Sequence, residues 1–134
     1  MAAHNAAGAL GERRVAQRLE TVAPVATEDV PADLQFCGVD VEVKTATPSR
    51  PNGRTLGYQF CLRKSGHTDI GKAHVVVLVC LDHHMSTRFT YVIPVATLGN
   101  RRKLTLPMHP QEDHWLTPYR ENWTIIARYI KEDA

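Results

Sequence analysis

Apolar and polar positions in the first part of the chain follow the period of an α-helix. From about residue 6 to residue 23, apolar residues recur every three or four positions, and charged residues occupy the opposite side. Asn5, just before this stretch, is of a residue type that caps helix N-termini. The pattern therefore predicts an amphipathic helix over residues 6–23.

The period then changes to that of β-strands. Residues 33–37 and 39–46 are two short strand-like runs with Gly38 between them, which predicts a hairpin. Residues 73–81 are almost entirely apolar, as in a strand covered on both faces. Further strands are expected at 56–63, 88–93 and 103–106, a short helix at 95–98, and a last helix from Thr117-Pro118 to about Ile130. This order predicts one α/β domain over residues 1–134, with a mixed sheet flanked by helices.

The composition of the chain excludes several classes of protein. The chain has 134 residues, of which 43% are hydrophobic and 22% charged, so disorder is excluded and one domain with a real core is expected. The longest apolar run, residues 75–81, is too short to span a membrane. The three cysteines form no CxxC pair, and we expect them to be small core residues in a reducing cytoplasm. The N-terminal stretch also lacks the charge order of a secretory signal.

Charge is strongly segregated along the chain. Residues 44–103 carry a net charge of +8, whereas residues 1–43 carry −4 and residues 104–134 carry −2. Such asymmetry points to a polyanionic partner, although an ordinary solvated surface is the alternative. The cations expected to contact a phosphate backbone are Arg50, Arg54, Arg63, Lys64, Arg101, Arg102 and Lys103.

One acidic residue breaks the pattern of the first helix. Helical spacing places Glu12 beside Val15, Ala16 and Leu19, within the apolar stripe. A buried carboxylate requires a nearby cation, a metal ion or a bound proton. The structural alternative is a helix-start Glu that pairs with the N-terminal turn or with a nearby Arg.

The run VDVEVKTA presents its charges on one face. Asp40, Glu42 and Lys44 alternate with three valines, and a solvated charge ladder would look the same. Folding the hairpin at Gly38, however, places Asp33 opposite the Glu42–Lys44 stretch. Paired carboxylates suit Mg²⁺, and a neighbouring Lys can serve an attacking water. Asp40 shares the face of Glu42 and is the alternative to Asp33 as a metal ligand.

Together these motifs resemble a known family. Glu12, Pro31-Ala32-Asp33 and Glu42-Val43-Lys44 resemble the PD-(D/E)XK nuclease superfamily. The segments VEVKTA, YQFCLRK, HVVVLVCL, FTYVIP and YRENW are similar to its small intron-encoded and Holliday-junction-resolvase-like members. The resemblance implies a restriction-endonuclease-like core. It implies that Asp33 and Glu42 hold Mg²⁺ or, in substitution, Mn²⁺, that Lys44 serves the water, that Glu12 assists and that Gln59 lies near the site.

The sequence thus predicts a Mg²⁺-dependent DNA endonuclease acting on duplex or branched DNA. The types left open are resolvase-like, intron-homing and restriction or defence enzymes, encoded by bacteria, archaea or phage and located in the cell interior. We expect a homodimer, with residues 115–130 in its interface, and no membrane association. The rival interpretation is a non-catalytic nucleic-acid-binding or structural protein, in which the Asp/Glu/Lys strand face is only a surface ladder.

Overall fold

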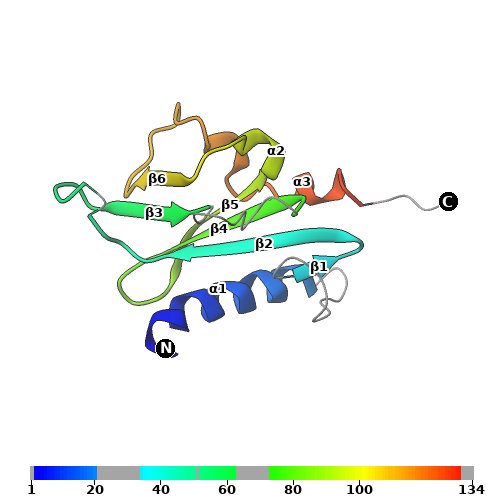
Figure 1. The fold of residues 1–134 in the computed structure, drawn as a ribbon, viewed down its shortest axis with the longest axis horizontal. Helices are drawn as coiled ribbons and strands as arrows, with labels where there is room; N and C mark the ends of the chain where they lie inside the picture. Colours follow the sequence, from blue (N-terminus) through cyan, green and yellow to red (C-terminus); the bar gives the residue numbers. More distant parts are fainter. Residues whose placement is uncertain (1, 21–33, 51, 63–72, 131–134) are drawn as a thin grey trace.

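The fold places one long helix beneath a four-stranded sheet and a two-stranded sheet above it (Figure 1). The computed structural model describes residues 2–20, 34–50, 52–62 and 73–130. The elements are α1 (Ala2–Glu20), β1 (Leu34–Phe36), β2 (Val39–Ala46), β3 (Gly57–Cys61), β4 (Val75–Leu81), β5 (Thr87–Pro94), α2 (Val95–Leu98), β6 (Lys103–Pro107), the 3₁₀ turn η1 (Thr117–Tyr119) and α3 (Thr124–Ala127). None of the described helices combines the length and apolar character of a membrane span.

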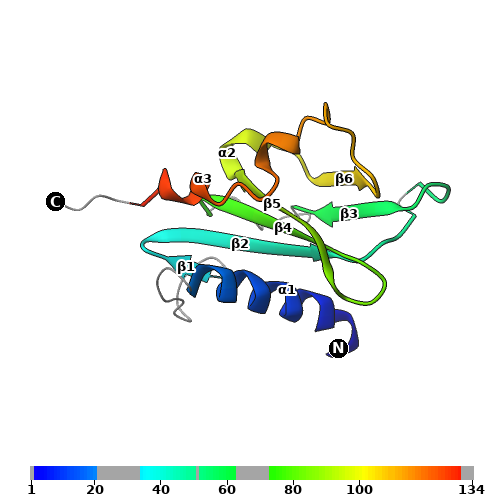
Figure 2. The same ribbon diagram turned by 180° about the vertical axis from the view of Figure 1, so that it is seen from behind.

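The larger sheet is mixed, with strand order β1-β2-β4-β5. Strands β2 and β4 are parallel, whereas β1 with β2 and β4 with β5 are antiparallel. Strands β3 and β6 form a separate antiparallel ribbon over the face opposite α1 (Figure 2). The predicted α/β class with a mixed sheet flanked by helices is confirmed. Strand β3, however, is not part of the larger sheet and pairs with β6 instead.

Burial of β4 explains why two cores form. All seven of its residues are buried, as its apolar run predicts. Val75, Val77 and Val79 face α1 and share a core with Val15 and Leu19. The alternate residues of β4 face the ribbon, in a second core. Its members include Val76, Leu78, Cys80, Tyr58, Phe60, Tyr91, Leu104 and Leu106.

The predicted hairpin is confirmed at the start of the sheet. Leu34 pairs with Val41 and Phe36 with Val39. Cys37 and Gly38 form the turn with φ values of 51° and 82°. Glycine adopts the positive φ at position 38 without the steric strain that a side chain would cause. This turn fixes the register of β1 against β2.

Two helix predictions need correction. The first helix begins at Ala2, so Asn5 lies within it instead of capping it. The expected helix from Thr117 to Ile130 is two short pieces, η1 and α3. Arg120 takes an extended conformation, and the Glu121 amide donates to the carbonyl of Thr90 at 2.7 Å. Backbone groups at this point thus form hydrogen bonds with the edge of β5 instead of the hydrogen bonds of a continuous helix.

Only one of the described cysteines is a core residue. Cys80 is buried between the sheets, and desolvation raises the pKa of its thiol to about 12. Cys37 and Cys61 are exposed, so the prediction that all three are core residues was wrong. Cys37 belongs to the hairpin turn, and Cys61 lies on the outer face of β3, which strand-like flanking residues could not reveal.

Candidate functional site

An acidic and a basic side chain meet on the face of β2 opposite α1. Val39, Val41 and Val43 are buried against α1, so strand alternation directs Glu42 and Lys44 to the other side. The Lys44 Nζ lies 3.9 Å from the Glu42 Oε2. The two side chains are only 20% and 12% exposed, respectively. The structure therefore brings these two predicted site residues together.

Apolar neighbours surround this pair. In the parallel register, Glu42 lies beside Val76 and Lys44 beside Leu78, both fully buried. Charges at the edge of such a core interact more strongly with each other and with a ligand than charges in bulk water. Removing either charge leaves the other in a poorly solvated place. Charged side chains on an ordinary solvated strand face would be more exposed than this pair.

Asp40 occupies the same face one pleat earlier. Its Oδ1 accepts a hydrogen bond from the Gln35 side-chain amide at 3.0 Å. Its backbone amide donates to the His74 Nδ1 at 2.9 Å. Asp40 is thus held beside Glu42 by Gln35 of β1 and by His74, which directly precedes β4. Asp33, the other candidate ligand, lies outside the described residues.

Helix α1 packs against β2 of the hairpin through a glycine. A side chain at Gly11 would overlap the Thr45 hydroxyl, so helix and strand touch at this point. Glu12 is the next residue and is half-buried, on the border of the buried stripe formed by Gly11, Val15 and Leu19. Because α1 covers the face opposite Glu42 and Lys44, an assisting role for Glu12 stays a prediction.

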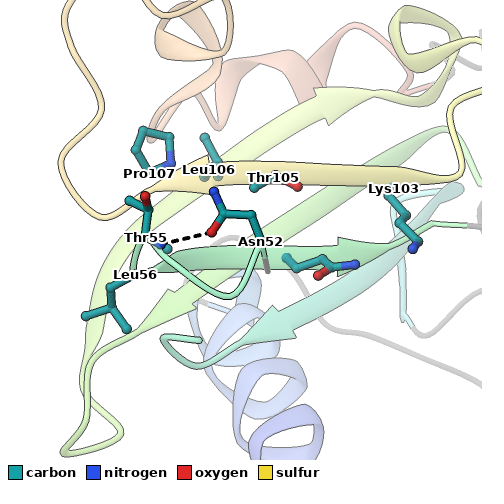
Figure 3. A pocket seen from close by; sticks show the side chains of 9 residues that line it. Asn52, Thr55, Leu56, Lys103, Thr105, Leu106 and Pro107 are labelled. Carbon is teal, nitrogen blue, oxygen red and sulfur yellow. Dashed lines mark hydrogen bonds between the residues drawn. The ribbon is translucent and has the colours of Figure 1, made fainter. Parts of the chain in front are cut away.

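Gln59 points away from the Glu42–Lys44 pair. Its neighbours Tyr58 and Phe60 are buried against the main sheet, so Gln59 lies on the outer face of the ribbon. There it lines a groove of about 500 Å³ (Figure 3). The other lining residues are Asn52, Thr55, Leu56, Gly57, Lys103, Thr105, Leu106 and Pro107. The structure does not bring Gln59 to the predicted catalytic face.

The predicted phosphate-binding cations gather at the two ends of this ribbon. Arg50 and Arg54 are exposed in the loop before β3, where the Arg50 Nη1 donates to the Arg54 carbonyl at 2.8 Å. Arg102 and Lys103 are exposed at the start of β6. Arg101 is also exposed, with its guanidinium carbon 4.7 Å from the Trp115 ring centroid. The remaining two cations, Arg63 and Lys64, lie outside the described residues.

Sequence reasoning overlooked Asn52 and Thr105. The Asn52 Oδ1 accepts hydrogen bonds from the backbone amides of Arg54 and Thr55, both at 2.9 Å, and so shapes the loop at the groove. Thr105 pairs with Gln59 across the ribbon. The alternation of residues 103–106 is a signal for the outward position of Thr105, but nothing local identifies its partner strand.

No family model matches this chain, and no curated protein sequence matches it either. Among solved structures, it is similar to that of the bacterial homing endonuclease I-Ssp6803I. The TM-score is 0.65 at 19% identity, over 91% of this chain and 89% of that one. The chain shares the fold of that structure.

Within this fold, the oxygen donors on β2 suit a hard divalent cation. The carboxylates of Asp40 and Glu42 share one face, and Mg²⁺ in proteins is commonly bound through one or two carboxylates plus water. Across the ranges that the structure describes, no group of three His, Cys, Asp or Glu side chains is arranged to hold a metal. Among the described residues, Glu42 and Asp40 are the carboxylates that a site on this face would use, and the other candidate ligand, Asp33, lies outside them.

Proposed function

We propose that this chain is a Mg²⁺-dependent DNA endonuclease of the PD-(D/E)XK type. The observation that carries the proposal is the half-buried Glu42–Lys44 pair on β2 of a nuclease fold. The neighbouring structure is described as a homing endonuclease, which supports a DNA substrate. The net charge of +8 over residues 44–103 agrees with a polyanionic partner.

The proposed roles follow from the chemistry of each side chain. Glu42 and Asp33 hold Mg²⁺, with Asp40 as the alternative to Asp33 and Mn²⁺ as a substitute ion. A divalent cation held by these carboxylates would supply activation of water and neutralisation of charge on the phosphate. The Lys44 ammonium orients the water and stabilises negative charge that develops on the phosphate oxygens. Glu12 assists from α1.

The reaction is hydrolysis of a phosphodiester. A water oxygen forms a new bond to phosphorus while the bond to one ester oxygen breaks. The departing oxygen takes up a proton and becomes a hydroxyl, so no other co-reactant is needed. Lys44 carries its own proton throughout and contributes charge and orientation.

A cleavage screen tests this proposal. Plasmid, linear duplex and four-way-junction DNA are incubated with the wild-type protein in Mg²⁺, in Mn²⁺ or in EDTA. We expect cleavage with either metal and none in EDTA. Preferential cutting of junctions indicates a resolvase-like enzyme, and cutting of duplex DNA at a defined site indicates a homing or restriction enzyme. Protein that leaves all three substrates intact with both metals overturns the proposal and favours the non-catalytic binding protein.

We also propose that the enzyme works as a homodimer. Each 15.0 kDa chain supplies one candidate site, whereas a double-strand cut requires two sites related by symmetry. The proposed interface includes residues 115–130. Trp115, which is 42% exposed, offers apolar surface in this region, and aromatic side chains are enriched in protein interfaces. Light scattering should give twice the chain mass, and a monomer both alone and on DNA would contradict the prediction.

Phosphate binding by the loop before β3 predicts a measurable salt dependence. The double variant Arg50→Ala/Arg54→Ala should bind duplex DNA more weakly. Its slope of log affinity against log salt should flatten by about 0.9 for each phosphate that the variant no longer neutralises. Arg13→Ala, which removes an exposed cation from α1, is the control and should leave the slope unchanged. An unaltered slope in the double variant would show that this loop does not meet DNA.

A further inference from the structure

The outer face of the β3–β6 ribbon is polar, although its inner face is a packed core. Tyr58, Phe60, Leu104 and Leu106 point inward and are at most 4% exposed. The register pairs Gln59 with Thr105 and Cys61 with Lys103 on the opposite face. The loop containing Asn52 and Thr55 borders the groove that Gln59, Thr105 and Lys103 line (Figure 3). The ribbon thus presents a row of hydrogen-bonding groups that the fold itself does not bury.

Cations flank this row at both ends. A backbone bridge between Ser49 and Gly57 places the arginine loop at the first residue of β3. The Leu62 amide donates to the Arg102 carbonyl at 2.8 Å, which places Arg102 beyond the last residue of β3. Residues 45–68 and 83–111 contain no Asp or Glu. The two strands of the ribbon and the chain segments that flank them therefore contain no acidic residue.

The cross-section of the ribbon fits a known dimension of DNA. Its two strands lie about 4.8 Å apart, and its five residue pairs extend over four steps of about 3.3 Å, or roughly 13 Å. The major groove of B-DNA is about 12 Å wide, has a phosphate strand on each side, and admits a two-stranded β-ribbon. The basic ends of a ribbon in the groove can then contact the bordering phosphates while the central side chains face the base edges.

We propose that the β3–β6 ribbon enters the major groove of duplex DNA and that Gln59, Thr105 and Lys103 read base edges there. This inference rests on the proposed function for the identity of DNA as the ligand. A Gln amide suits the donor and acceptor of adenine, Lys suits the two acceptors of guanine, and Thr contacts either base or the methyl group of thymine. Gln59 is therefore a specificity residue, in keeping with its direction away from Lys44.

The native cysteines provide a direct test of where DNA lies. Cys61 is exposed on the outer face of the ribbon, Cys37 is exposed in the β1–β2 turn, and Cys80 is buried with a raised pKa. Wild-type protein is alkylated in EDTA, with and without a duplex selected from a randomised pool, and labelling is followed by mass spectrometry. We expect bound duplex to slow modification of Cys61 at least several-fold and to leave Cys37 unchanged. Unchanged Cys61 labelling under saturating duplex overturns the inference.

Selection from the randomised pool tests the base contacts. Gln59→Ala and Thr105→Ala should each lose discrimination at one or two base positions, by about 5- to 150-fold. The controls are Gln17→Ala on α1 and Thr97→Ala on α2, both at exposed positions. The controls should select the same sequences as wild type. Ribbon variants that keep the full wild-type preference overturn the inference.

These measurements separate the inference from the proposed function because both are made without divalent metal. If ribbon variants change base preference but wild type cuts no DNA in Mg²⁺ or Mn²⁺, the ribbon assignment stands and the endonuclease proposal fails. If wild type cuts DNA and ribbon variants keep both Cys61 labelling and base preference, the endonuclease proposal stands and the ribbon assignment fails. Absence of any duplex binding overturns the ribbon assignment.

Discussion

Replacing Lys44 with alanine should abolish DNA cleavage and leave DNA affinity close to that of the wild type. The Lys44 ammonium is only 20% exposed and lies 3.9 Å from the Glu42 carboxylate, so its charge is directed at the proposed reaction site and not at a broad DNA surface. Loss of one such group from a preorganised site costs about 100- to 1000-fold in rate. Single-turnover cleavage and fluorescence-anisotropy binding in EDTA measure the two effects separately. Lys44→Ala protein that cuts at the wild-type rate would contradict the proposed role.

Glu42→Ala and Asp33→Ala should also abolish cleavage, but through loss of metal. Carboxylates crowded at one place repel each other, so Mg²⁺ should raise the melting temperature of the wild type. We expect this rise in Lys44→Ala and its loss in both carboxylate variants. Glu12→Ala should reduce cleavage without removing the metal-induced rise.

Asp40→Ala is the matched control for the choice of ligand. It removes a carboxylate from the same face of β2, one pleat before Glu42. Activity that survives in Asp40→Ala but not in Asp33→Ala assigns the metal to Asp33. The opposite result transfers the role to Asp40, whose carboxylate Gln35 already positions.

The second large effect concerns stability. Gly11→Ala should destabilise the fold by about 1–3 kcal/mol, because its new Cβ would overlap the Thr45 hydroxyl and force α1 away from β2. Gly8→Ala is the matched control in the same helix, and its Cβ would meet nothing within 4 Å. There the higher helix propensity of alanine should stabilise the fold by about 0.5–1 kcal/mol. Urea unfolding at constant m-value measures both changes.

Thr45→Ala provides the partner for a double-mutant cycle with Gly11→Ala. Among the described residues, the buried Thr45 hydroxyl has no hydrogen-bond partner, so its removal alone should cost little. Combined with Gly11→Ala, it should restore part of the stability, with a coupling of about 0.5–2 kcal/mol. Equal losses for Gly8→Ala and Gly11→Ala, or purely additive effects with Thr45→Ala, would contradict this account of the helix–sheet packing.

Several features were predictable from the sequence because they depend on neighbouring residues. The period of two along β2 places Glu42 and Lys44 on one face whatever the surrounding fold is. Gly38 marks the hairpin turn because its φ of 82° disfavours other residues. The apolar run of β4 requires cover on both faces, and this requirement predicted the layered α/β class.

Only the tertiary structure decided toward which neighbouring element each face of a strand points. Strand β3 pairs with β6, more than forty residues further along the chain, and this pairing turns Gln59 outward to the groove instead of toward Lys44. The interruption of the expected C-terminal helix at Arg120 and Glu121 likewise depends on β5, which is distant in sequence. Alternation within a strand assigns side chains to two faces. Which face lies toward the core and which toward solvent depends on long-range strand pairing and on competition for backbone hydrogen bonds, and no local pattern contains this information.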